Sequence, residues 1–121
     1  MTVDTDAIAF LYLAFAHATD GALSGEEMRT LAERLRGWRP EVGLDAIGEQ
    51  IKSTVGRYKQ LATREQRLAA ANDQATALAR TLTVEQRQRV LADLNAIAEV
   101  DGTVAEQERA FLDGIRGTLG V

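Results

Sequence analysis

Residues 7–16 read AIAFLYLAFA, an uninterrupted run of apolar side chains near the start of a chain of 121 residues. A helix formed by this run is apolar on most of its circumference, which is typical of a central, buried helix. The run is about half as long as a membrane span requires. Asp4 and Asp6 precede it and no Lys or Arg occurs before Arg29, which argues against a secretory signal. We therefore expect this helix to form the centre of the fold.

Apolar residues recur at helical spacing beyond this run, and no segment shows sustained strand alternation. The pattern predicts an all-α fold, a compact bundle of about six helices that forms one domain over residues 1–121. Three helices are expected at about residues 5–19, 24–37 and 44–61, and three more that begin after Thr63, after Thr83 and after Asp101-Gly102. Thr63 with Gln66 and Thr83 with Gln86 have the spacing of a capping box, which marks a helix start.

Charge and composition exclude several classes of function. The formal net charge is -4 and the pI is about 5.0, so phosphate backbones and anionic lipid surfaces are repelled on balance. The chain contains no cysteine, which excludes disulfides, thiolate metal sites and thiol nucleophiles. We expect a cytoplasmic protein that does not bind nucleic acid and does not span a membrane.

The two ends of the chain repeat one pattern at a separation of 81 residues. The matching pairs are Leu13 and Leu94, Asp20-Gly21 and Asp101-Gly102, Leu23 and Val104, Glu27 and Glu108, and Leu31 and Leu112. In each copy a helix ends at Asp-Gly, and a second helix with Glu in its first turn follows. The repeat predicts two pseudo-symmetric helix-turn-helix halves, with the middle helices inserted between them.

At these turns the chain resembles the tellurite-resistance TerB-like domains. Residues 18–27 read ATDGALSGEE and residues 97–108 read IAEVDGTVAEQE, and both fit a small residue, Asp-Gly, an aliphatic residue and then Glu. The resemblance implies an α-helical bundle with pseudo-twofold halves and a cytoplasmic location. It also implies a role of the acidic positions in binding a divalent metal or in organising a stress-response assembly.

The acidic residues of the two turns are candidate metal ligands. Asp20, Glu27, Asp101 and Glu108 supply four carboxylates, the ligand type that Ca²⁺, Mg²⁺ and Mn²⁺ prefer, if the two turns converge. Each copy matches only half of an EF-hand loop, because apolar residues occupy most of the earlier ligand positions. The same residues also suit a purely structural role, in which Asp-Gly ends one helix and Glu caps the next. Both interpretations stay open from the sequence.

Two other side chains are candidates for function. His17 is the only histidine, and nothing in the sequence supplies a nucleophile and an orienting group for it, so a structural role is favoured over catalysis. Trp38 is flanked by Arg36, Arg39 and Pro40. It is either an exposed anchor for a protein partner or, as we favour, a side chain that folds back onto the bundle.

The residues and the resemblance together predict a non-enzymatic helical module that binds an unidentified protein partner, with a divalent cation at the acidic turns. The resemblance implies that the module acts in a stress response. The alternative is a small-molecule sensor or enzyme with a pocket near His17, which two nearby carboxylates would favour. A third hypothesis is an assembly domain that forms a homodimer through its alanine-rich fourth helix.

Overall fold

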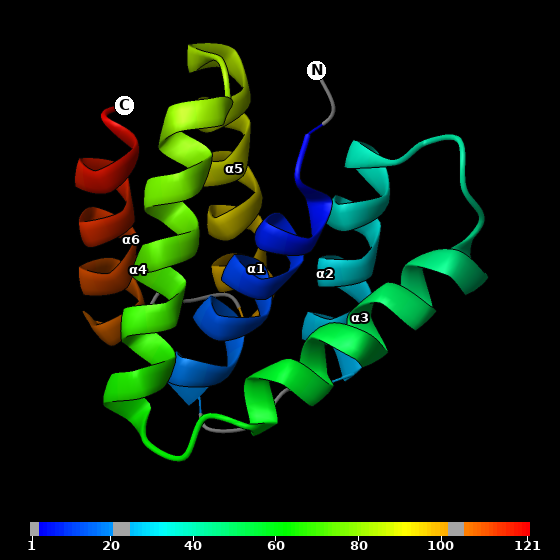
Figure 1. The fold of residues 1–121 in the computed structure, drawn as a ribbon, viewed down its shortest axis with the longest axis horizontal. Helices are drawn as coiled ribbons and strands as arrows, with labels where there is room; N and C mark the ends of the chain where they lie inside the picture. The colour runs from blue at the N-terminus through cyan, green and yellow to red at the C-terminus, as the bar shows by residue number, and fades with distance from the viewer. Residues whose placement is uncertain (1–2, 21–24, 102–105) are drawn as a thin grey trace.

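A computed structural model describes residues 3–20, 25–101 and 106–121, and these residues form an all-α bundle without strands (Figure 1). Its elements are α1 (Thr5–Asp20), α2 (Gly25–Trp38), α3 (Leu44–Lys59), α4 (Arg64–Thr81), α5 (Val84–Ala98), the short 3-10 helix η1 (Glu99–Asp101) and α6 (Glu106–Leu119). The predicted fold class is confirmed. No helix in these three ranges is long and apolar enough to cross a membrane.

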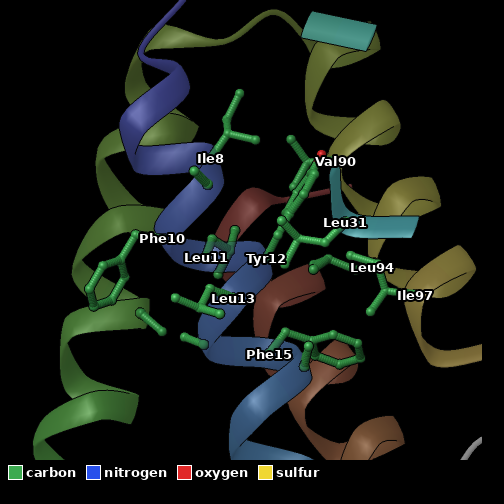
Figure 2. Packing of buried hydrophobic residues seen from close by; sticks show 14 of the residues in the cluster. Ile8, Phe10, Leu11, Tyr12, Leu13, Phe15, Leu31, Val90, Leu94 and Ile97 are labelled. Carbon is green, nitrogen blue, oxygen red and sulfur yellow. The ribbon is translucent and has the colours of Figure 1, made fainter. Parts of the chain in front are cut away.

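Helix α1 is the centre of the bundle, as its composition predicts. Every residue from Ala7 to Ala16 is buried, and α1 packs against each of the other five α-helices of the described chain. Figure 2 shows Tyr12 and Phe15 on the side of α1 that faces Leu94 and Ile97 of α5, whereas Phe10 points to the other side. A helix that is apolar all round needs neighbours on all sides, and the other helices supply them.

The helices of the two predicted halves run in matching directions. In Figure 1, α1 and α5 run from the top of the view to the bottom, and α2 and α6 run back to the top. Helices α2 and α6 each contain 14 residues, and a shift of 81 carries Gly25–Trp38 onto Glu106–Leu119. These bounds agree with the repeat, while an axis that relates the halves stays a prediction. The described ends of α1 and α5 and the starts of α2 and α6 therefore lie at one end of the bundle.

The helix boundaries confirm both predicted capping boxes. The Thr63 and Thr83 side chains each accept from the backbone N–H of the glutamine three residues later, and that glutamine accepts from the backbone N–H of the threonine. Ser24, where the second helix was expected to begin, lies outside the described residues.

Three helix ends differ slightly from the prediction. Helix α3 ends at Lys59, and α5 gives way to η1 after Ala98. Helix α2 continues through Gly37 to Trp38. Glycine inside a helix costs about 1 kcal/mol, but the buried partners of the Trp38 indole hold the last turn in place.

The alanine-rich helix α4 packs inside the bundle. Ala71 and Ala75 are buried, and the most extensive helix contact in the fold is between α4 and α1. Small side chains allow two helix backbones to approach closely. Ala71 and Ala75 thus serve the core, whereas Ala69 and Ala77 of the same helix are exposed, and the homodimer stays a prediction.

A truncation in α1 tests its central position. Leu11 is fully buried, so Leu11→Ala should lower the free energy of unfolding by about 2–5 kcal/mol. Leu44 is 58% exposed at the start of α3, and Leu44→Ala should change it by less than about 0.5 kcal/mol. Urea denaturation followed by circular dichroism measures both, and equal losses in the two variants would contradict a central α1.

Candidate functional site

The first turns of α2 and α6 each contain a buried glutamate. Glu27 and Glu108 are both 5% exposed, although neighbouring first-turn residues Glu26 and Glu106 are exposed. Both buried carboxylates have interaction partners in the structure. A negative charge in the first turn is stabilised by the helix dipole, which accounts for part of the burial. Equivalent positions of the repeat are therefore buried to the same extent.

The short helix that leads into the second acidic turn packs against a helix of the first copy. Helix η1, which ends at Asp101, packs against α2, whose first turn contains Glu27. The side chains of Asp20 and Asp101 lie outside the described part of the chain, so the predicted set of four carboxylates is described only for its two glutamates. Among the described side chains, no three acidic, histidine or cysteine residues form a group that could hold a metal ion.

Around mid-bundle, a buried polar cluster connects α1, α2 and α5. The Tyr12 hydroxyl donates to Oδ2 of Asp93 at 2.5 Å, and Nε1 of Trp38 donates to both Tyr12 Oη and Asp93 Oδ2 at 3.1 Å. Asp93 is 3% exposed. Burial, followed by the negative charge of Asp93, raises the pKa of Tyr12 well above its usual value. The phenol therefore stays protonated and remains a donor to the carboxylate.

Two arginines close this cluster towards the solvent. Nη1 of Arg34 lies 3.6 Å from Oδ1 of Asp93, with the Arg34 side chain half exposed. The guanidinium of Arg89 stacks on the Trp38 ring, 4.5 Å from its centroid. Trp38 is thus half buried and packs back onto the bundle, as favoured from the sequence, and is not a free anchor for a partner.

The sequence analysis missed Asp93, although two signals pointed to it. It lies on the apolar face of its helix between Val90 and Ile97, where an unpaired carboxylate is rarely tolerated. It also lies 81 residues after Tyr12, its hydrogen-bond donor, so the repeat register places the two partners at equivalent positions. An acidic residue on a buried stripe, matched to a tyrosine in the other copy, predicts such a pair.

A pocket of about 300 Å³ lies beside His17, as the alternative hypothesis predicted. Leu13 of α1, Met28 of α2 and Val55 of α3 form its apolar walls. His17 is in the last turn of α1, and Tyr58 is near the end of α3. The helix ends that carry His17 and Tyr58 lie at the same end of the bundle as the starts of α2 and α6 (Figure 1).

The polar side chains of this pocket are neutral or positive. Nδ1 of His17 and the Tyr58 hydroxyl share a hydrogen bond of 3.0 Å, and the rings meet edge to face. Burial, and secondarily the charge of Arg67, lowers the pKa of His17 below its ordinary value of 6.5. Lys59 and Arg67 complete the lining. The residues described around this pocket include no carboxylate, so the acid and base pair that would favour an enzyme is not among them.

Comparison with known protein families agrees with the arrangement of helices. The described residues form a compact all-α bundle around a buried first helix. The family model described as tellurite resistance protein TerB matches residues 5–121, and the chain belongs to this family. Neither a comparison with curated proteins nor one with solved structures found a match.

Removal of one hydroxyl tests the buried cluster. Tyr12→Phe leaves the buried Asp93 carboxylate without its shortest hydrogen bond and should cost about 1.5–3 kcal/mol of unfolding free energy. Tyr58→Phe removes a hydroxyl that meets a neutral imidazole and should cost about 0.5–1.5 kcal/mol. Urea unfolding followed by Trp38 fluorescence compares them, and a loss at Tyr58 as large as that at Tyr12 would contradict the assigned roles.

The lowered pKa of His17 predicts a pH dependence of stability. The folded state binds a proton at His17 more weakly than the unfolded chain does, so protonation favours unfolding. This contribution to stability is complete above pH 6.5 and is lost as the pH falls from there towards the folded pKa. As the pH falls from about 7.5 to about 5, the free energy of unfolding of His17→Gln should decrease less than that of the parent. If the free energy of unfolding depended on pH in the same way in both proteins, the assignment of this pH dependence to His17 would be contradicted.

Proposed function

We propose that this chain is a cytoplasmic, non-enzymatic TerB module that binds a divalent cation at its acidic end and a protein partner in a stress response. The acidic end is defined by Asp20, Glu27, Asp101 and Glu108. The observation that carries the proposal is the burial of both glutamates at equivalent helix starts, with η1 packed against α2.

The chemistry of the acidic end suits a hard cation. Carboxylate oxygens are the preferred ligands of Ca²⁺, Mg²⁺ and Mn²⁺, and turns allow aspartates to adjust to the ion. Four carboxylates that converge at one end repel one another, and a divalent cation relieves that repulsion. Glu27 and Glu108 already have partners, so the ion would share these carboxylates with them.

A second surface supports the protein-binding part of the proposal. A shallow, open depression of about 490 Å³ lies where α2 leads into α3 and includes Pro40 and Leu44. Leu44 is 58% exposed, and Glu33 and Arg36 add both signs of charge beside it. An apolar centre with a charged rim is the usual composition of a non-obligate protein interface. The non-enzymatic part rests on the sequence, which contains no recognisable set of nucleophile, base and orienting group.

Calorimetric titration with Ca²⁺, Mg²⁺ and Mn²⁺ tests cation binding. The parent should bind at least one of the three with saturable heat and a raised Tm. Asp20→Asn with Asp101→Asn should abolish both effects, because asparagine keeps the turn conformation but removes the charge. The double variant should lose only a little stability in the absence of metal.

A charge-matched pair controls for the change in net charge. Asp45 and Asp73 are exposed on α3 and α4, and Asp45→Asn with Asp73→Asn should leave the response intact. An equal loss in this control would mean that the ions bind only through overall charge. No heat and no change in Tm at millimolar metal would remove the cation from the proposal.

A further inference from the structure

The pocket beside His17 has the features of a ligand site, and it is separate from the proposed cation site. Its walls are apolar, and its cationic groups come from two different helices, Lys59 at the end of α3 and Arg67 in the first turns of α4. The chain as a whole is acidic, so a positive pocket is a local exception to its charge.

Arg67 is held in place at the pocket by two contacts. Its Nε donates to the Leu61 carbonyl at 3.2 Å, and its guanidinium lies over the Tyr58 ring, 4.9 Å from the centroid. Neither contact neutralises the positive charge of the guanidinium. A guanidinium that is oriented before binding loses less conformational entropy when it binds an anion.

The two cations have no carboxylate partner in the described part of the chain. The one ion pair found there joins Arg34 to Asp93, in the buried cluster. His17 does not neutralise these cations, because burial lowers the pKa of its ring and so favours the neutral form. The pocket thus combines apolar walls with positive charge that no described side chain neutralises.

Size and charge together define the ligand. A volume of about 300 Å³ is at the lower end of the range for small-molecule sites, which suits a small ligand. We propose that this pocket binds a small organic acid, with its aliphatic or aromatic body between Leu13, Met28 and Val55 and its carboxylate at Arg67 and Lys59. The carboxylate accepts charge-assisted hydrogen bonds from the Arg67 Nη groups, and the body replaces water on the apolar walls.

Titration of the full chain with sodium octanoate tests this site. The ring protons of His17, the only histidine, give NMR signals that need no further assignment, and they should shift and saturate with octanoate. Acetate, which lacks the apolar body, and 1-octanol, which lacks the charge, should each bind about tenfold more weakly or not at all. A chelator in all samples makes the outcome independent of the cation proposed above.

Matched variants separate the pocket from overall charge. Lys59→Gln with Arg67→Gln should weaken octanoate binding about tenfold or more, because the charge-assisted hydrogen bonds are lost. Lys52→Gln with Arg80→Gln makes the same charge change at exposed positions of the same two helices and should leave the affinity unchanged. Val55→Phe, which fills part of the pocket, should also weaken binding.

Three results would overturn the assignment. One is a shift of the His17 signals that fails to saturate with octanoate. Another is equal binding of octanoate and 1-octanol, which would mean that the pocket binds apolar groups and does not recognise the carboxylate. The third is an equal loss of affinity in the Lys52 and Arg80 control, which would mean nonspecific attraction of anions.

Discussion

The Asp93 carboxylate lies in the core with 3% of its surface exposed, and a charge in such a place is costly unless it is paired and hydrogen-bonded. Tyr12 of α1 and Trp38 of α2 donate hydrogen bonds to it, and Arg34 of α2 supplies the positive charge. All three interactions form only when α1, α2 and α5 have their native positions. A purely apolar contact tolerates sliding, whereas these hydrogen bonds specify one arrangement of the three helices.

That arrangement determines which helix ends meet at one end of the bundle. With α1 and α5 fixed side by side and running the same way, both end where α2 and α6 begin (Figure 1). The buried glutamates of the two helix starts and the pocket beside His17 therefore share one end. The two sites proposed above, one for a cation at the acidic positions and one for an organic anion in the pocket, would therefore share one end of the molecule and differ in charge.

Much of this fold could be predicted from the sequence, because its strongest signals are local. The apolar run of residues 7–16 predicted the central helix, and the spacing of Thr63 with Gln66 and of Thr83 with Gln86 predicted two helix starts. The end of α2 was misplaced because Gly37 is a local stop signal, while the Trp38 contacts that override it are tertiary.

The sites were harder to predict, because they depend on which helices meet. The acidic positions were recognisable as a repeat, yet the contact between η1 and α2 follows from the packing. A pocket near His17 was considered with carboxylates beside it, but the structure brings Lys59 and Arg67 there from helices distant in sequence. The most direct test of the central role of Asp93 is a double-mutant cycle of Tyr12→Phe and Asp93→Leu, measured by urea unfolding. We predict that the double variant is more stable than the sum of the single losses implies, by about 1–2 kcal/mol, whereas losses that add to within about 0.5 kcal/mol would contradict the account.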